Sequence, residues 1–125
     1  MIFKLRTSKE TMEIFEEIGT SLHLQPYALC KIAIALSLRK CEMDELDFQT
    51  DNDGLELNRQ TITGEYDELF KALIISYHGK IIADDEYFPK YLKAHIDRGA
   101  KKLRSEFRYS NGNLYKHLLD VDKGV

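Results

Sequence analysis

Over residues 28–38 the chain reads ALCKIAIALSL, with Gln25 and Pro26 shortly ahead of this stretch. Proline is favoured in the first turn of a helix, where its missing N–H donor costs nothing, so these two residues predict the start of a helix. The body of that helix is apolar on almost every face. Such a helix has to be surrounded, either by the rest of the chain or by another copy of it. We therefore expect a helical core and self-association.

A short strand and a helix are predicted on the N-terminal side of this core helix. Residues 3–7 alternate apolar and basic side chains, as a half-buried strand does. Thr7 and Glu10 have the spacing of a capping box, which predicts that a helix begins there. Its apolar positions recur every three residues up to Ile18, and Gly19 is predicted to end it.

A small β-hairpin and a third helix are predicted on the C-terminal side. Asp53-Gly54 is a turn signal, and we expect residues 47–49 to pair with residues 55–57 around it. The third helix is expected from Thr63 or Gly64 onward, with an apolar stripe on one face, until a glycine stops it.

The last major helix is predicted to begin at residues 84–86, whose acidic side chains suit a helix N-terminus, and to run to about Phe107. A turn at residues 110–113 and a short helix at residues 114–119 follow, and residues 120–125 form a polar tail.

The composition indicates a single globular domain. The chain has 125 residues, of which 43% are apolar and 31% charged, and this composition excludes a disordered chain. No window approaches the ~18 consecutive apolar residues of a membrane span, and the first residues carry charges where a signal peptide is apolar, so we expect a cytoplasmic protein. We predict a mainly α fold, a compact helical domain of four to five helices with a short N-terminal strand and a small β-hairpin, over residues 1–119.

Charge is distributed unevenly along the chain, although the formal net charge is only -3. Lys4, Arg6 and Lys9 precede the first acidic residue. Residues 10–89 then carry 17 acidic and 6 basic side chains, whereas residues 90–117 carry 8 basic and 2 acidic ones. This segregation suits a protein that turns one face toward a polyanion and keeps an acidic face away from it.

Basic residues of the predicted last helix fall on one face. At 100° per residue they form a row that only Asp97 interrupts, and an apolar stripe runs beside it. Such a helix can offer its cations to successive phosphates without reading the base sequence, whereas a merely solvated face is the alternative. The row consists of Lys90, Lys93, Lys101, Arg104 and Arg108. The residues that we predict to bind DNA are Lys4, Arg6 and Lys9 near the N-terminus and Lys93, Arg98, Lys101, Lys102, Arg104 and Arg108 on the last helix.

Catalytic motifs are missing from the sequence, which has no GxSxG, Walker, GxGxxG or HExxH pattern. His95 is the one candidate for a catalytic base, and a structural histidine is the alternative. Cys30 and Cys41 form no CxxC pair, which indicates reduced thiols, and the histidines show no HxxxH spacing. We therefore expect no catalytic residue, no metal site and no cofactor.

A strand followed by two helices is also the order of elements in ribbon-helix-helix repressors, in which paired strands enter the major groove of DNA. Lys4 and Arg6 would then face the bases. This start of the chain is a rival DNA-binding mode, although the strand offers few positions that could face a groove.

Several stretches resemble the DndE family of DNA phosphorothioation proteins in their order and spacing. They are FKLRTSKE (3–10), IAIALSL (32–38), GEYD (64–67) and LKAHIDRG (92–99), and the resemblance extends over residues 2 to about 118. It implies a part in replacing a non-bridging phosphate oxygen of DNA by sulphur, beside a cysteine desulphurase, an iron–sulphur protein and an ATPase that carry the chemistry.

The resemblance further implies a mostly helical homotetramer that prefers nicked duplex DNA. By association it implies a sulphur-relay role for Cys30 or Cys41, which the apolar surroundings of Cys30 disfavour. Our primary hypothesis is a non-catalytic accessory protein that binds the DNA backbone and positions other DNA sulphur-modification proteins. The alternatives are a scaffold that docks those proteins through its basic helix without touching DNA, and a small enzyme centred on His95 or a cysteine.

Overall fold

The computed structural model describes residues 3–39 and 45–110 of the 125-residue chain. The predicted short helix at residues 114–119, the polar tail after it and Cys41 lie outside the described residues, as does most of the turn predicted at residues 110–113.

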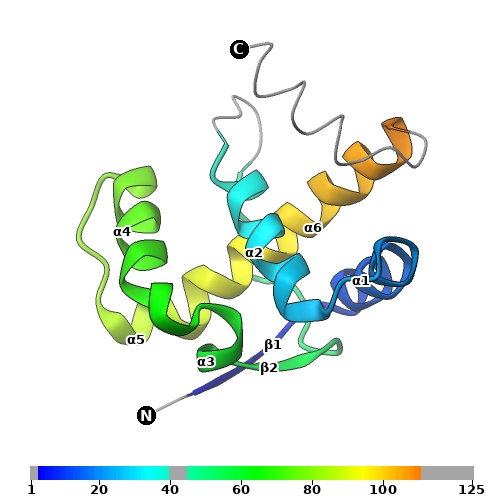
Figure 1. Ribbon diagram of the computed structural model, residues 1–125. Coiled ribbons are helices and arrows are strands. Elements are labelled where there is room, and N and C mark those ends of the chain that lie inside the picture. Colours follow the sequence, from blue (N-terminus) through cyan, green and yellow to red (C-terminus); the bar gives the residue numbers. More distant parts are fainter. Residues whose placement is uncertain (1–2, 40–44, 111–125) are drawn as a thin grey trace.

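The described residues form a mainly helical fold with one small antiparallel sheet, and Figure 1 shows α6 in the middle of it. In chain order the elements are β1 (Lys4–Arg6), α1 (Lys9–Leu22), α2 (Pro26–Ser37), β2 (Glu56–Asn58), α3 (Arg59–Ile62), the 3-10 turn η1 (Gly64–Tyr66), α4 (Asp67–His78), α5 (Asp84–Glu86), the π-helical turn η2 (Tyr87–Tyr91) and α6 (Leu92–Tyr109). The predicted fold class is confirmed. In the described part of the chain, none of the helices combines the length and the apolar character that a membrane crossing requires.

The core forms where α6 packs against both α2 and α1. Gly99 of α6 lies so close to α2 that a Cβ added to it would stand 1.7 Å from the carbonyl oxygen of Ala33. Only glycine permits this approach of two backbones. The inward side of α2 is buried at this crossing, whereas Tyr27 and Ala35 on its other side are exposed. Among the residues that the structure describes, the apolar helix predicted from the sequence is therefore covered on its inward side, while Tyr27 and Ala35 stay exposed.

Helix α1 begins and ends at other residues than predicted. Its N-cap is Ser8, whose Oγ accepts the N–H of Thr11 at 3.0 Å, whereas Thr7 turns inward and accepts the N–H of Leu55. The helix passes Gly19 and ends at His23, which has the left-handed conformation (φ 58°). Gly19 is needed for another reason, since a Cβ on it would lie 2.9 Å from the carbonyl oxygen of Leu24, where the chain turns back after the helix.

The predicted hairpin around Asp53-Gly54 is wrong. β2 pairs antiparallel with β1, with Leu5 opposite Leu57, and residues 47–49 form no strand. A Cβ on Gly54 would lie 2.1 Å from the carbonyl oxygen of Ser8, so this glycine permits a close passage of two segments. The strand–helix–helix order expected at the N-terminus is present, and the partner of its strand comes from the same chain.

The third helix ends at Gly79 (φ 66°), and its main helical part, α4, begins at Asp67 after the turn η1. The last helix is shorter than predicted. Phe88 leaves the helical region (φ -121°, ψ 122°) before a cis Phe88–Pro89 bond, so that α6 starts only at Leu92.

Candidate nucleic-acid interface

The two basic segments predicted from the sequence meet around one carboxylate. Glu10, in the first turn of α1, accepts a hydrogen bond from Arg104 Nη2 at 2.6 Å and lies 4.0 Å from Lys101 Nζ. Lys9 precedes Glu10 in the same turn, and Arg108 follows Arg104 one turn later on α6. We call Lys9, Lys101, Arg104 and Arg108 the α1–α6 basic surface.

A buried carboxylate holds α1 in this position on α6. Asp97, which is 2% exposed, accepts hydrogen bonds through Oδ1 from the N–H of Ser8 at 3.1 Å and from Thr11 Oγ1 at 2.7 Å. Its Oδ2 accepts from Thr50 Oγ1 at 2.6 Å and pairs with Lys93 Nζ at 2.7 Å. Asp97 thereby joins the start of α1 and the segment 45–55 to α6.

Lys93 and Arg98, both predicted to bind DNA, make contacts inside the protein. The Lys93 side chain is only 14% exposed, because it pairs with Asp97 and donates to Thr50. Arg98 donates through Nε to Ser37 Oγ at 2.9 Å and through Nη2 to Tyr77 Oη at 2.9 Å, which links α6 to α2 and α4. We therefore leave both residues out of the interface.

The remaining predicted residues differ in exposure. Lys4, Arg6, Lys9, Lys101 and Arg108 are exposed, whereas Lys102 and Arg104 are half-buried. Lys4 and Arg6 each lie 3.7 Å from the Glu56 carboxylate across the sheet. Exposed ion pairs of this kind contribute little to stability, so a phosphate can compete for these cations.

His95 is buried in a chain of polar side chains. Its Nδ1 lies 2.8 Å from Ser37 Oγ and its Nε2 lies 3.0 Å from His78 Nε2, while Arg98 donates to the same Ser37 hydroxyl. Burial, followed by the charge of Arg98, lowers the pKa of His95 to about 3, and burial also lowers the pKa of His78. A histidine that is neutral and 0% exposed is unsuited to meet a substrate as a base.

Cys30 is likewise fully buried, in α2. Burial raises the pKa of its thiol to about 12, whereas a sulphur relay needs the thiolate. Among residues 3–39 and 45–110, no three histidine, cysteine, aspartate or glutamate side chains gather as metal ligands would.

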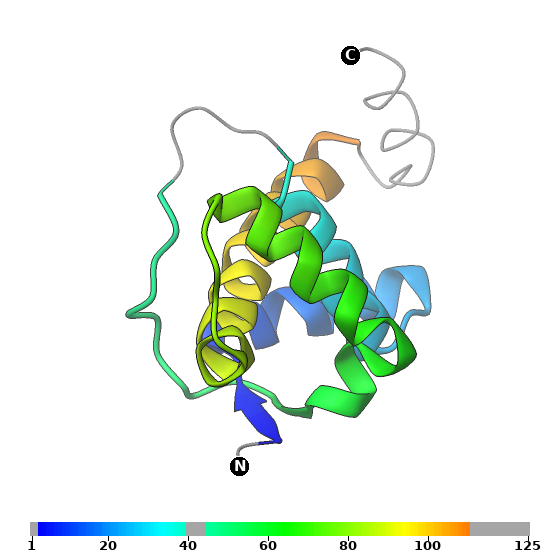
Figure 2. The ribbon, with the colours of Figure 1, turned by 90° about the vertical axis from the view of Figure 1, so that its left-hand side faces the viewer.

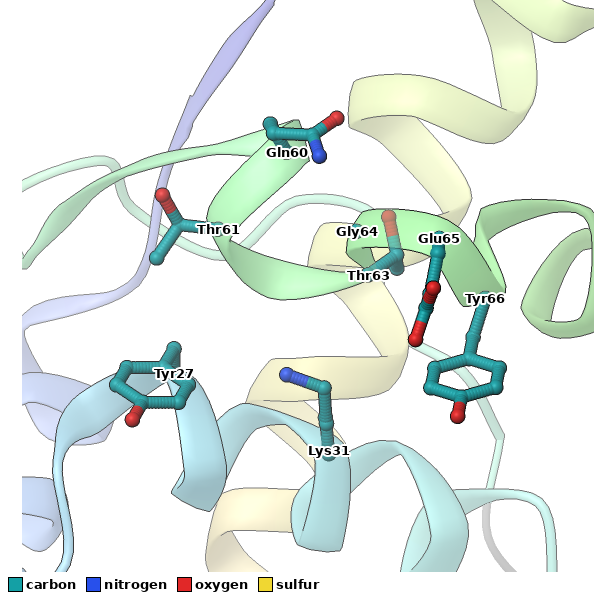
Figure 3. Close-up of a pocket in the computed structure, with 8 residues that line it drawn as sticks. All are labelled: Tyr27, Lys31, Gln60, Thr61, Thr63, Gly64, Glu65 and Tyr66. Carbon is teal, nitrogen blue, oxygen red and sulfur yellow. The ribbon is translucent and has the colours of Figure 1, made fainter.

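A pocket that sequence reasoning missed lies between α2 and the segment formed by α3 and η1. Its volume is about 280 Å³, and Figure 3 shows the Lys31 amine pointing from α2 toward that segment, between the rings of Tyr27 and Tyr66. The other lining residues are Gln60, Thr61, Thr63, Gly64 and Glu65. None of the residues predicted to bind DNA lines this pocket. No local sequence motif predicts the pocket, because its two walls come from distant parts of the sequence.

The family model described as DNA sulphur modification protein DndE matches residues 4–111. A search of curated proteins finds no significant match. Among solved structures, the crystal structure of DndE from Escherichia coli B7A, described as involved in DNA phosphorothioation modification, has a TM-score of 0.64 at 17% sequence identity, over 82% of this chain and 97% of that chain.

A second similar structure is a DndE mutant with lysines in place of two glycines, described as involved in DNA phosphorothioation. It has a TM-score of 0.62 and 17% identity, over 84% of this chain and 99% of that chain. At this identity the two structures show a shared fold. Because the family model covers most of the sequence, this chain belongs to the DndE family of DNA sulphur-modification proteins.

Proposed function

We propose that this protein is a non-catalytic accessory protein of the DNA phosphorothioation system that binds the backbone of duplex DNA, preferably nicked DNA, in the cytoplasm. On this proposal it helps to position the other DNA sulphur-modification proteins that carry the chemistry. The observation that supports it best is that Lys101 and Arg104 of α6 pair with Glu10, the residue after Lys9, which brings α6 and the start of α1 together.

The charge balance of this surface favours an anionic partner. Two of the four cations of the α1–α6 basic surface, Lys101 and Arg104, share the carboxylate of Glu10, and the Lys101–Glu10 pair is long and exposed. Phosphates can replace such a weak internal partner at little cost. Lysine and arginine on the outside of a helix position a protein on the DNA backbone without reading bases, so we expect binding that is independent of sequence.

The surroundings of His95 and Cys30, the two candidate reactive residues that the structure describes, support a non-catalytic role. His95 is buried and neutral, and Cys30 is buried as a thiol. Neither side chain reaches the surface, where a DNA phosphate or a sulphur donor would have to approach.

The outer face of α4 supports the proposal of a homotetramer. Leu69 and Leu73 are 55% and 45% exposed, and Ile74 is the only fully buried residue of this helix. In Figure 2 no other described helix lies over α4. Contiguous exposed apolar side chains mark interaction surfaces, and another copy of the chain is the partner that we propose. The mass of the protein in solution, with a Leu69→Lys/Leu73→Lys variant beside it, tests this part.

The experiment for DNA binding compares a Lys9→Gln/Lys101→Gln/Arg108→Gln variant with the unchanged protein on one duplex. We expect weaker binding and a salt dependence that is shallower by about 0.9 for each phosphate that the variant no longer neutralises. Lys71→Gln is the matched control, because Lys71 pairs with Asp84 instead. Unchanged affinity in the triple variant would refute this interface and favour the scaffold that docks partner proteins.

A further inference from the structure

A second group of cations and aromatic rings lies outside the α1–α6 basic surface, around Tyr91 in η2. The Tyr91 ring is 4% exposed because other side chains cover it. The ring of Phe48 lies 5.0 Å from it and that of His78 4.8 Å, both edge to face. The ammonium groups of Lys80 and Lys90 lie 5.5 and 5.7 Å from the ring centroid.

Lys80 and Lys90 are held in place without being neutralised. Lys90 also lies 5.1 Å from the Phe48 ring, so aromatic faces position both ammonium groups while leaving their charge intact. Both side chains are exposed, and within the described residues neither has a carboxylate inside 4.0 Å. The Tyr91 hydroxyl, and to a smaller extent Glu86, raise the pKa of Lys80, which therefore stays charged.

Exposed apolar side chains stand beside these cations. Phe48 is 38% exposed, and Ile81, next to Lys80 in the sequence, is 94% exposed. Positioned cations beside an accessible aromatic ring are what proteins use to hold single-stranded nucleic acid, with phosphates on the cations and bases stacked on the ring.

We propose that Lys80, Lys90 and Phe48 form a second nucleic-acid contact, which takes a phosphate and an unpaired base of a DNA strand. This inference rests on the proposed function, because it assumes that the protein meets DNA. An intact duplex cannot fill the aromatic part, since both faces of its bases are already stacked. The contact therefore selects DNA with a strand end or a gap.

The second contact is separated from the α1–α6 basic surface by the segment that follows Phe48. Thr50 of this segment binds Lys93 and Asp97, and the Asp51 carboxylate accepts the N–H of Lys9 at 2.8 Å. An acidic side chain thus stands between the two basic groups. From the start of α6 to Arg104 the helix rises about 18 Å, which corresponds to about five phosphate spacings along one strand of a duplex.

The test measures binding of a fluorescent oligothymidylate strand and of an intact duplex by the full-length protein. We expect Phe48→Ala to weaken strand binding by about tenfold or more and to leave duplex binding unchanged. Lys80→Gln/Lys90→Gln should lower the salt slope for the strand by about 0.7 for each phosphate that is no longer neutralised. Phe48→Tyr, which keeps the ring, should bind like the unchanged protein, and unchanged duplex binding by Phe48→Ala shows that the alanine variant is still folded.

Lys31→Gln is the matched control, because Lys31 also lies over an aromatic ring, 5.0 Å from Tyr27, but away from Tyr91. If the unchanged protein binds duplex DNA while Phe48→Ala and Lys80→Gln/Lys90→Gln keep full affinity for the strand, this inference is overturned and the proposed function stands. If the unchanged protein binds neither DNA form at low salt, the proposed function fails and this inference fails with it.

Discussion

Replacing Gly99 by alanine tests the packing that places α6 in the fold. Alanine in a helix interior is ordinarily about 1 kcal/mol more favourable than glycine. Here its Cβ would lie 1.7 Å from the carbonyl oxygen and 2.3 Å from the carbonyl carbon of Ala33, whereas ordinary contact begins at 3.4 Å. Because these are main-chain atoms, α2 and α6 have to move apart, and overpacking of this kind costs typically about 1–3 kcal/mol or more. We expect the free energy of unfolding to fall by about 2 kcal/mol or more.

Urea unfolding followed by circular dichroism measures this decrease. With a denaturant slope of about 1–3 kcal/mol per molar urea, the midpoint should fall by about 1 M. Ser105→Ala, on the exposed side of the same helix, should stay within about 0.5 kcal/mol of the unchanged protein. Adding Ala33→Gly should not rescue Gly99→Ala, because the clash is with the backbone of Ala33. A Gly99→Ala protein as stable as the unchanged one would refute the close crossing of α2 and α6.

Three further outcomes follow from the buried polar groups. Asp97→Ala should cost about 3–5 kcal/mol in urea unfolding, since it leaves the Lys93 ammonium half-buried without its carboxylate, and a decrease below about 1 kcal/mol would contradict its role in joining α1 to α6. The pKa of His95 is about 3 in the folded protein and 6.5 in the unfolded chain. Between these two pH values the unfolded chain binds a proton at His95 and the folded protein does not, so the free energy of unfolding should fall as the pH drops below 6.5. The urea midpoint between about pH 7.5 and about pH 5 should fall less in His95→Gln, and equal slopes would speak against a neutral buried histidine. In a Cys41→Ser background, Cys30 should resist a thiol reagent in the folded protein and react fully in urea. Rapid labelling of the folded protein would contradict this and favour the sulphur-relay role.

The parts of the fold that local signals decide were predictable from the sequence. Pro26 does open α2, and Gly79 does end α4, because each acts through its own backbone geometry. The pairing of β2 with β1 was not predictable in this way, because it joins residues about 50 positions apart. Asp53-Gly54 has the sequence of a hairpin turn, yet Gly54 is required by the close passage of Ser8.

The candidate interface was likewise predictable only where it depends on residues close together in the sequence. Segment charge counts located the basic residues, but a helical wheel assumes an unbroken helix, and the break at Phe88 removes Lys90 from the row on α6. Lys93 and Arg98 turn inward toward Thr50 and Ser37. A helical wheel cannot show this, because both of these partners come from other segments. The meeting of Glu10 with Arg104 likewise depends on Asp97, which the sequence showed only as an interruption in a basic row.

The central claim is that the protein holds DNA through backbone phosphates, and a salt titration of the unchanged protein tests it most directly. Binding to intact, nicked and single-stranded DNA of one sequence is measured from low to physiological salt. If the α1–α6 basic surface contacts four phosphates, the logarithm of duplex affinity should fall against the logarithm of salt with a slope of about -3.6, and more steeply if Lys4 and Arg6 join. A flat response, or no binding at low salt, would contradict this claim.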